Sequence, residues 1–500
     1  MSVLSIDAGT TGVTALIVTA DGAVAARGYQ EFRQYFPQPG WVEHLPEGIW
    51  QAALSACAQA LQSGGGDDVQ CVGITNQRET AVIWDRATMA APRRAIVWQD
   101  RRTAGICAEL RERGLEPRVS ALTGLRIDPY FTGTKLTWLA RNEPALWAGV
   151  SDGSLAIGTV DSYLIARLTG GRRHVTDASN ASRTLLFDIE AGQWSAELCE
   201  IFGVPPHALP EVVPSTGTAG HTDPGAFLGL SVPVAGIAGD QQAAMFGQAC
   251  FAPGSVKCTY GTGSFVLTNT GPSIVRSRAG LLATVAWMND KGDLTYALEG
   301  SVFVTGAAVQ WLRDGLGLLD NAAQSEALAG SVPDAGGVTF VPALTGLGAP
   351  DWDPDARGAM FGLTRGTTRA HLVRAALEAI TFEVRDVFDV MAAETAGQAA
   401  DGPAVSAAAP LRVDGGASVN NLLMQLQADQ LQIPVERPVI AETTALGAAF
   451  LAGLACGVWS APGELAASWQ LDRRFTPGRR DEDGYARWRR AVQRTKGWAS

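Results

Sequence analysis

The first residues that could do chemistry form a short turn near the start of the chain. Residues 7–12 read Asp-Ala-Gly-Thr-Thr-Gly and lie between two apolar segments that we expect to be strands. Glycine lets the backbone approach an oxyanion closely, and threonine hydroxyls and backbone N–H groups donate hydrogen bonds to it. The carboxylate of Asp7 could hold Mg2+, directly or through water. The turn therefore indicates a metal–phosphate site, although strand–Gly–strand hairpins that bind nothing are also common.

Two later segments repeat this design. Residues 256–269 place a Gly-Thr-Gly turn between two expected strands, and residues 411–421 run from a strand through a glycine pair into a helix. A GxxxxGK[ST] loop is absent, as is a GxGxxG motif after the first strand, so P-loop and Rossmann binding lose most of their support. The sequence instead predicts a nucleotide in a cleft, with one turn from each half on the phosphates and the glycine pair beside the nucleoside.

The elements that must position these turns follow from hydrophobic periodicity. Strands are expected at 3–7, 13–19, 23–29, 69–75 and 232–238, and helices at 46–61, 303–317 and 368–396. The segments 205–225 and 397–410, which are rich in Pro, Gly or Ala, are expected to be loops. Because the strand–turn–strand unit recurs, we expect two related α/β domains with mixed sheets. Their predicted bounds are 1–246 and 247–460, with a tail at 461–500 that packs on the domain.

Composition narrows the class of protein. The 500 residues are 46% hydrophobic and 18% charged, which is typical of a globular enzyme. A net charge of −11 argues against binding to nucleic acid or to an anionic membrane. The seven cysteines have no metal-ligand spacing and are expected to be buried thiols. With no signal peptide visible, and with the uncharged stretch 443–460 interpreted as a buried helix rather than a membrane span, the predicted location is cytoplasmic.

Longer motifs add a specific resemblance. The matching segments are 39–44, 73–80, 96–102, 128–135, 176–183, 236–243, 260–263 and 340–350. With these motifs the chain resembles the FGGY family of carbohydrate kinases up to about residue 460, and within it the enzymes that phosphorylate glycerol. The implied fold is α/β, with two ribonuclease H-like domains of the actin/Hsp70/sugar-kinase type flanking a nucleotide-binding cleft. The implied reaction uses ATP and Mg2+ to convert glycerol, a small polyol, to sn-glycerol 3-phosphate.

The resemblance implies a role for each substrate-side residue. Asp240 is the general base, and Arg78 and Glu79 hydrogen-bond neighbouring substrate hydroxyls. The remaining implied substrate contacts are Trp98, Tyr130, Gln241 and Phe265. Each has a plainer alternative: Asp240 could cap a helix, Arg78 and Glu79 could be a surface charge pair, and the aromatic residues could be core packing.

The resemblance also implies a nucleotide side. Phosphate contacts are assigned to Thr10, Thr11, Gly12 and Thr262, and nucleoside contacts to Gly306, Gln310, Gly416 and Asn420. Asp7 and Asp240 are assigned to Mg2+. Ordinary helix packing is the alternative for the Gly306 region. A homo-oligomer, dimer or tetramer, is the expected assembly.

The chain departs from the glycerol-phosphorylating pattern at the first turn. Ala8 replaces a glutamine, and Thr14 stands where a phosphate-facing arginine is usual. Charge-assisted hydrogen bonds are about twice as strong as neutral ones, so the loss of the arginine should weaken phosphate binding. Either another cation replaces it, or turnover is lower, or the preferred phosphoryl donor differs. Two rival functions therefore stay open: a kinase of another polyol or ketopentose, and an ATP-binding sensor. The segment 221–230 lacks a Gly-Gly-Thr-Arg loop and has Ala226 where some relatives carry a phosphorylatable histidine, so neither known control is predicted.

Overall fold

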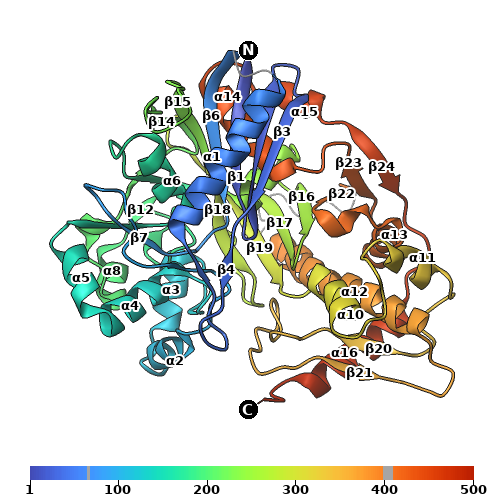
Figure 1. Cartoon of the computed structure of the whole chain (residues 1–500). Coiled ribbons are helices and arrows are strands. Elements are labelled where there is room, and N and C mark those ends of the chain that lie inside the picture. The colour runs from blue at the N-terminus through green and yellow to red at the C-terminus, as the bar shows by residue number, and fades with distance from the viewer. Residues whose placement is uncertain (65–67, 398–408, 500) are drawn as a thin grey trace. The chain divides into compact units, whose positions relative to one another are not determined.

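The computed structural model describes residues 1–64, 68–397 and 409–499 (Figure 1). The chain folds as two compact units, and each is assembled from separate stretches of sequence. The first unit contains Met1–Ala249, Ala283–Tyr296 and Thr443–Trp469. The second unit contains Cys250–Leu282, Ala297–Glu442 and Gln470–Ser500. Both units therefore depend on segments that are far apart in the sequence.

A six-stranded mixed sheet forms the centre of the first unit, in the order β14-β15-β6-β1-β2-β3. β1 is antiparallel to β2, whereas β6 is parallel to both β1 and β15. The carboxyl ends of β1, β6 and β15 therefore meet at one edge of the sheet, where Asp7 pairs with Thr75 and Gly239 pairs with Asn76. The strand bounds are β1 (Ser2–Ala8), β2 (Gly12–Thr19), β3 (Val24–Glu31), β6 (Val69–Asn76), β14 (Thr216–His221) and β15 (Pro233–Gly239).

Helices cover both faces of this sheet. Val72 and Ile74 of β6 share a core with α1 (Pro46–Ser63) and α6 (Val160–Leu168). Gly73 lies between them in sequence, so it points to the other face. There it is so close to α14 (Thr443–Ala455) that a Cβ would lie 2.1 Å from the carbonyl oxygen of Ala448. α14 therefore covers the face opposite α1 and α6.

α14 also explains the uncharged stretch near the carboxyl end. Almost all of its side chains are buried, and it packs on α9 (Asp240–Gly247) through two glycines. A Cβ on Gly447 would lie 1.8 Å from the carbonyl oxygen of Ala243, and one on Gly247 would lie 2.1 Å from that of Thr443. The prediction of a buried helix is confirmed. In the described part of the chain, no helix is long and apolar enough to cross a membrane.

Shorter elements between β6 and β15 carry further side chains toward the carboxyl edge of the sheet. β7 pairs with β9, and β10 pairs with β13. The remaining bounds in this stretch are β7 (Val82–Asp85), β8 (Ala95–Ile96), α2 (Ala104–Glu112), α3 (Glu116–Thr123), α4 (Thr132–Asn142), α5 (Pro144–Ser151), β9 (Leu155–Gly158), β10 (Val175–Asp177), α7 (Ala178–Ala181), α8 (Ala196–Phe202) and β13 (Glu211–Val213).

The second unit repeats the start of the first. β16 (Val256–Tyr260) is antiparallel to β17 (Ser264–Gly271) and parallel to β22 (Leu411–Asp414), as β1 is to β2 and β6. The order within this unit is β19-β17-β16-β22-β23-β24. Its other bounds are β19 (Leu294–Val302), α10 (Gly306–Asp314), α12 (Arg369–Gly397), α13 (Asn421–Leu431), β23 (Val435–Pro438), β24 (Leu471–Phe475) and α16 (Glu482–Thr495).

The expected strands and long helices are confirmed to within a few residues. The loop prediction for 205–225 is wrong over 211–221, where β13 and β14 form. β14 pairs with β15, the next strand along the chain, and β13 pairs with β10, so strand pairing satisfies backbone groups in a segment whose composition predicts a loop. Most of the other expected loop, residues 398–408, lies outside the described residues.

Candidate active site

The carboxyl end of β6 delivers the central residues of the site. Beyond the strand, the backbone N–H of Gln77 donates to the carbonyl oxygen of Ala8 at 2.8 Å, and its side chain donates to that of Gly9 at 2.9 Å. These two bonds fix the first turn onto β6. Glu79 then adopts a φ of 62°, a left-handed conformation that is uncommon for a residue with a side chain. The unusual backbone here aims consecutive side chains, Arg78 and Glu79, into one polar group.

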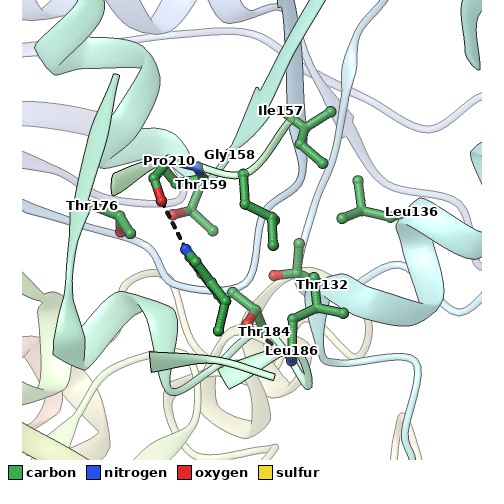
Figure 2. A pocket seen from close by; sticks show the side chains of 11 residues that line it. Thr132, Leu136, Ile157, Gly158, Thr159, Thr176, Thr184, Leu186 and Pro210 are labelled. Atoms are coloured by element: carbon green, nitrogen blue, oxygen red, sulfur yellow. Dashed lines mark hydrogen bonds between the residues drawn. The ribbon is translucent and has the colours of Figure 1, made fainter. Parts of the chain in front are cut away.

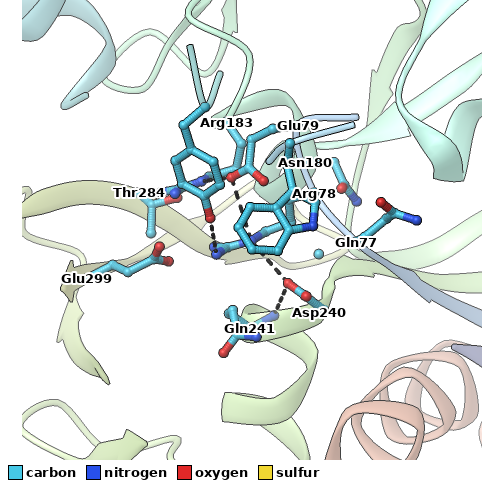
Figure 3. A network of polar contacts seen from close by, with 12 residues as sticks. Gln77, Arg78, Glu79, Asn180, Arg183, Asp240, Gln241, Thr284 and Glu299 are labelled. Carbon is cyan, nitrogen blue, oxygen red and sulfur yellow. Dashed lines mark hydrogen bonds and ion pairs between the residues drawn. The ribbon is translucent and has the colours of Figure 1, made fainter. Parts of the chain in front are cut away.

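Arg78 is at the centre of that group (Figure 3). Its side chain is only 2% exposed, and its Nε lies 3.1 Å from Oδ1 of Asp240. Its other nitrogens donate to the Tyr130 hydroxyl and to Oε1 of Gln242, both at 3.3 Å. A planar guanidinium with several fixed partners has little freedom to move. Arg78 therefore holds the Asp240 carboxylate and the Tyr130 hydroxyl close to each other.

Asp240 is the first residue of α9 and follows directly on β15. The helix cap is Gly239, so the alternative that Asp240 is the N-cap is wrong. Its Oδ1 accepts from the backbone N–H of Gln241 at 2.7 Å, and its side chain is 29% exposed. A carboxylate oxygen at the start of a helix and beside a guanidinium is a candidate acceptor for a proton. Gly239 is required because a Cβ there would lie 2.7 Å from the Arg78 side chain.

Glu79 is equally buried, with 1% of its side chain exposed. Its Oε1 accepts from Nε of Arg183 at 2.7 Å and lies 3.8 Å from Nε of Arg78. The surface-pair alternative for Arg78 and Glu79 is therefore wrong. Arg183 is fully buried, and its guanidinium lies 5.6 Å from the ring centre of Tyr130 and 5.3 Å from that of Phe131. Two arginines and two aromatic rings thus hold one buried carboxylate.

Arg183 is a residue that sequence reasoning missed. Its segment, 176–183, was part of the resemblance, but no role was assigned to it. A buried hydrogen-bond group docks this segment onto the strand ends. The Asn180 and Asn76 side chains bond each other at 3.0 and 3.2 Å, and Ser179 Oγ accepts from the Gly239 backbone at 2.9 Å. In the sequence, the only local feature that could have indicated a role for Arg183 is its place at the end of a run of small polar residues.

Lys135 was missed as well. It is fully buried, and its Nζ donates to the backbone carbonyl oxygen of Tyr130. Burial lowers the pKa of Lys135 to about 8, while the carboxylates of Glu79, Asp100 and Asp128 act in the opposite direction. The lysine therefore fixes the backbone that carries the Tyr130 ring.

The aromatic residues join the site to the first turn. The Trp98 indole N–H donates to Oγ1 of Thr10 at 3.0 Å, and its ring meets that of Tyr130 edge-on at 5.6 Å. Tyr130 is 3% exposed, but its hydroxyl lies on Arg78, so core packing alone does not describe it. The structure therefore brings Thr10, Trp98, Tyr130, Arg78 and Asp240 into one connected set.

The rest of the first turn lies beside this set. Thr11 is exposed, whereas Gly12 is buried so close to Tyr29 that a Cβ would lie 2.8 Å from the phenol oxygen. Asp7 is half-buried at the end of β1 and pairs across the hairpin with Thr14. Asp7 is near the end of β1 and Asp240 follows β15, the two strands on either side of β6, so their backbones are roughly 10 Å apart at normal strand spacing.

The other predicted residues belong to the second unit. Thr262 is exposed in the turn between β16 and β17 and accepts backbone bonds from Thr305 and Ala307 at 2.8 and 3.1 Å. A Cβ on Gly306 would lie 2.7 Å from the carbonyl oxygen of Gly261, so α10 begins against this turn. Thr262 and Gly306 are therefore neighbours. Gln310 is exposed further along α10, and Phe265 is half-buried on β17.

The glycine pair also lies next to this turn. Gly415 has a φ of 84°, and a Cβ there would lie 2.6 Å from the carbonyl oxygen of Tyr260. Gly416 is exposed with no atom near its Cβ position, so its surface is open. Asn420 caps α13 by accepting from the Leu423 backbone at 2.9 Å, and its amide donates to Ser325.

One small cavity lies behind Glu79 in the first unit. Figure 2 shows that it is surrounded mainly by aliphatic groups, with Thr132, Leu136, Ile157 and Leu186 among its lining residues. Its volume of about 10 Å³ is the room of roughly one water molecule. Thr132 on its wall donates to the Glu79 carbonyl oxygen at 3.0 Å. The cavity is therefore part of the packing that supports the site and is too small for a substrate.

Comparisons with known proteins cover the whole chain. It is 52% identical over 501 residues to glycerol kinase 2 of Thermotoga maritima, covering 99% of both chains. It is 54% identical over 504 residues to the glycerol kinase of Symbiobacterium thermophilum, covering 100% of this chain and 99% of the relative. Among solved structures, Plasmodium falciparum glycerol kinase with ADP superimposes with a TM-score of 0.88 at 34% identity, covering 99% and 98% of the two chains.

The family assignment rests on both halves. Residues 2–247 match the N-terminal domain of the FGGY family of carbohydrate kinases, and residues 256–456 match its C-terminal domain. The two matches span the first turn, the Arg78–Asp240 group and the Gly-Thr-Gly turn. The chain belongs to the FGGY family of carbohydrate kinases.

Proposed function

We propose that this protein is a glycerol kinase, which transfers the γ-phosphoryl group of ATP to glycerol and releases sn-glycerol 3-phosphate and ADP. The observation that carries the proposal is the ion pair between Arg78 and Asp240, with the Tyr130 hydroxyl and the Glu79 carboxylate beside it. These groups supply donors and acceptors for adjacent hydroxyls of a small polyol. Identities above 50% to glycerol kinases over the full chain support the same substrate.

Asp240 is the proposed general base. Its carboxylate takes the proton from the attacking hydroxyl while the hydroxyl oxygen bonds to the γ-phosphorus and the bond to ADP breaks. The partial exposure of the side chain lets the proton leave to water afterwards. Arg78 positions the carboxylate and donates to a substrate oxygen, and Glu79 accepts from a neighbouring hydroxyl. A polyol lacking one hydroxyl would leave a buried partner unpaired, which gives specificity.

Trp98, Tyr130, Gln241 and Phe265 are the proposed remaining contacts to glycerol. Trp98 and Tyr130 meet edge-on beside Arg78, so they offer an apolar surface next to polar groups. A carbon chain that carries a hydroxyl on every atom needs both kinds of surface.

ATP is the proposed phosphoryl donor, as expected for a carbohydrate kinase. Thr10, Thr11 and Gly12 in the first unit and Thr262 in the second are the proposed phosphate contacts. Gly306, Gln310, Gly416 and Asn420 are the proposed nucleoside contacts. The exposure of Thr11 and Thr262 and the open surface at Gly416 support these assignments.

Mg2+ fits the carboxylates at this edge of the sheet. In the described residues, no group of three or more His, Cys, Asp or Glu side chains could hold a metal ion. Mg2+ in kinases needs only one or two carboxylates, because phosphate and water oxygens complete its shell. Asp7 and Asp240 would supply those oxygens. When bound, the ion neutralises phosphate charge.

A coupled ADP-release assay tests the proposal. Glycerol is compared with other small polyols and a ketopentose, using wild type, Asp240→Asn and the loop variant Asp223→Asn. We expect glycerol to be the preferred acceptor, Asp223→Asn to match wild type, and Asp240→Asn to lower kcat by about 10²–10⁴-fold. Preference for another acceptor would refute the substrate. Equal rates for wild type and Asp240→Asn would instead favour the ATP-binding sensor.

A further inference from the structure

The phenol hydroxyl of Tyr29 lies against the first turn of the chain. Tyr29 is on β3, the edge strand of the sheet in the first unit, and it is 37% exposed. A Cβ on Gly12 would lie 2.8 Å from the hydroxyl oxygen and 2.9 Å from the ring. Among the described residues, none exchanges a hydrogen bond with this hydroxyl, whereas the Tyr29 backbone N–H donates to Oε1 of Gln59 at 3.2 Å. The hydroxyl can therefore donate to a molecule bound at the turn.

Glycine at position 12 makes room for the phenol. Gly12 begins β2, and its backbone is not in the left-handed region, so its conformation does not require glycine. A side chain there would overlap the Tyr29 phenol and the carbonyl oxygen of Gln30, which lies 2.9 Å from the Cβ position. The close approach of β3, rather than the conformation of the turn, therefore accounts for the glycine.

Tyr29 shares a face of the sheet with Asp7 and Thr14. Asp7 pairs with Thr14 across β1 and β2, and Thr14 pairs with Tyr29 across β2 and β3. Side chains of directly paired residues lie on the same face. Gly28 faces α1, where a Cβ would lie 1.9 Å from the carbonyl oxygen of Ala56, so Tyr29 faces away from α1. Asp7, Thr14 and Tyr29 therefore form a row across the end of the sheet that carries the first turn.

Arg27 adds a positive charge beside the phenol. Its guanidinium carbon lies 5.5 Å from the centre of the Tyr29 ring, a distance at which a cation and an aromatic face attract each other. Arg27 and Tyr29 are two residues apart on β3, so both face the side that carries Asp7 and Thr14. An anion at the first turn would therefore meet a hydroxyl donor with a cation next to it.

We propose that Tyr29 is a further phosphate contact of the first turn, whose hydroxyl donates a hydrogen bond to a phosphate oxygen of the bound nucleotide. The contact rests on the proposed function, because ATP is the phosphate-bearing ligand assigned to this turn. Thr14, the direct cross-strand neighbour of Tyr29, is the residue at which the chain departs from the glycerol-phosphorylating pattern. Tyr29 thus supplies, from the next strand, a donor that Thr14 lacks the length to supply.

The hydroxyl should act on nucleotide affinity and not on acceptor affinity or folding. A hydrogen bond to a charged group contributes more than one between neutral groups, so its loss should weaken ATP binding roughly 10-fold. Tyr29→Phe keeps the ring and its contact with Arg27. Because the hydroxyl has no partner among the described residues, the melting temperature should not change.

Isothermal titration calorimetry of the full chain with ATP and Mg2+, in the absence of glycerol, tests the contact. We expect Tyr29→Phe to raise the Kd for ATP roughly 10-fold and to leave the melting temperature and the KM for glycerol at their wild-type values. The matched control is Tyr35→Phe, on β4 (Gln34–Tyr35). The Tyr35 ring also lies under a guanidinium, that of Arg94 at 3.9 Å, and its hydroxyl likewise has no partner among the described residues. This control should bind ATP as wild type does.

The outcomes separate the contact from the proposed function. If wild type does not bind ATP, the proposed function fails, and the contact fails with it. If wild type binds ATP and Tyr29→Phe binds it equally well, or if Tyr35→Phe loses as much affinity as Tyr29→Phe, the contact alone is overturned. Since no acceptor is present in the titration, a preference for an acceptor other than glycerol would not alter the result.

Discussion

Individual residues of the site are held from several directions at once. Glu79 lies between Arg78 and Arg183, and the Thr132 hydroxyl donates to its backbone. A buried carboxylate is costly unless charged donors surround it, so its position depends on both arginines. Arg183 is therefore a positioning residue for Glu79, the proposed substrate contact.

Arg183→Met should raise the KM for glycerol roughly 10- to 100-fold, because Glu79 loses a charged hydrogen bond and no longer lies in a fixed place. The KM for ATP should change much less. Breaking a buried ion pair should also lower the free energy of unfolding by about 3–5 kcal/mol. Steady-state kinetics and denaturant unfolding measure both effects.

Two variants separate positioning from general damage. Arg183→Lys keeps the charge and should recover part of the glycerol affinity. Arg118→Met removes an exposed ion pair with Glu197 and should leave kinetics and stability unchanged. An Arg183→Met enzyme with normal KM for glycerol would contradict the role given to Arg183.

Trp98 connects Tyr130, a proposed substrate contact, to Thr10 of the proposed phosphate turn. Trp98→Phe keeps a ring beside Tyr130 but removes the 3.0 Å hydrogen bond that the indole N–H donates to Thr10. Thr10 then loses a fixed orientation, so the KM for ATP should rise about 3- to 10-fold. Trp194→Phe, which loses a similar bond to Pro210, is the matched control and should not alter the KM for ATP. Equal effects of the two variants would argue against the connection.

At the scale of elements, close helix packing positions Asp240, the proposed general base. Asp240 begins α9, and α9 packs on α14 through Gly247 and Gly447 with almost no space for a Cβ. Small residues at such a crossing let the two backbones approach. The position of Asp240 is therefore linked to a helix that begins 203 residues later in the sequence.

Gly447→Ala should separate α9 from α14, since its Cβ would overlap the carbonyl oxygen of Ala243. We expect a loss of about 1–3 kcal/mol in unfolding free energy, together with a lower kcat because Asp240 shifts. Gly463→Ala on α15 (Pro462–Ser468) is the control, because nothing lies near its Cβ position. It should be neutral or slightly stabilising. Thermal melts and the ADP-release assay decide, and a fully active, stable Gly447→Ala enzyme would refute the link.

The elements also show where sequence reasoning reaches its limit. Periodicity predicts β1, β2, β6 and α1 because each has its own apolar pattern and turn residues. It does not predict β13 and β14, whose backbone is satisfied by strands elsewhere in the chain. Arg78, Glu79 and Asp240 were assigned by motif, whereas Arg183 and Lys135 were not. Arg183 bonds Glu79, which is 104 positions away in the sequence, and Lys135 bonds the backbone carbonyl oxygen of Tyr130. No local sequence pattern predicts either contact.

At the scale of the whole molecule, ionisable groups in the first unit make stability depend on pH. Burial lowers the pKa of His44 and of His174 to about 4, below the unfolded value of 6.5. Each histidine contributes stability that is fully present above pH 6.5 and is lost as pH falls toward 4, by up to about 3 kcal/mol. Burial raises the pKa of Asp161 to about 6, so its contribution is lost as pH rises from 3.8 to 6.

As the pH falls, the two histidines together lower the free energy of unfolding by more than Asp161 raises it. Between pH 6.5 and 4 the net change from these three groups is therefore a loss of about 3 kcal/mol in the free energy of unfolding. His44 has a further consequence, because its Nδ1 accepts from the side chain of Gln77 at 3.3 Å, and that side chain also donates to Gly9 of the first turn. Protonation of Nδ1 would remove this acceptor.

Urea unfolding at pH 7, 6 and 5 tests this account with His44→Gln, whose amide oxygen can still accept from Gln77 but does not titrate. The free energy of unfolding of wild type should fall as the pH is lowered. For the variant it should fall less steeply, because up to one proton fewer is taken up on unfolding. His207→Gln, an exposed histidine, is the matched control and should keep the wild-type slope. If His44→Gln and wild type lose stability in parallel, His44 is not a neutral buried imidazole, and the acid sensitivity of the molecule has another origin.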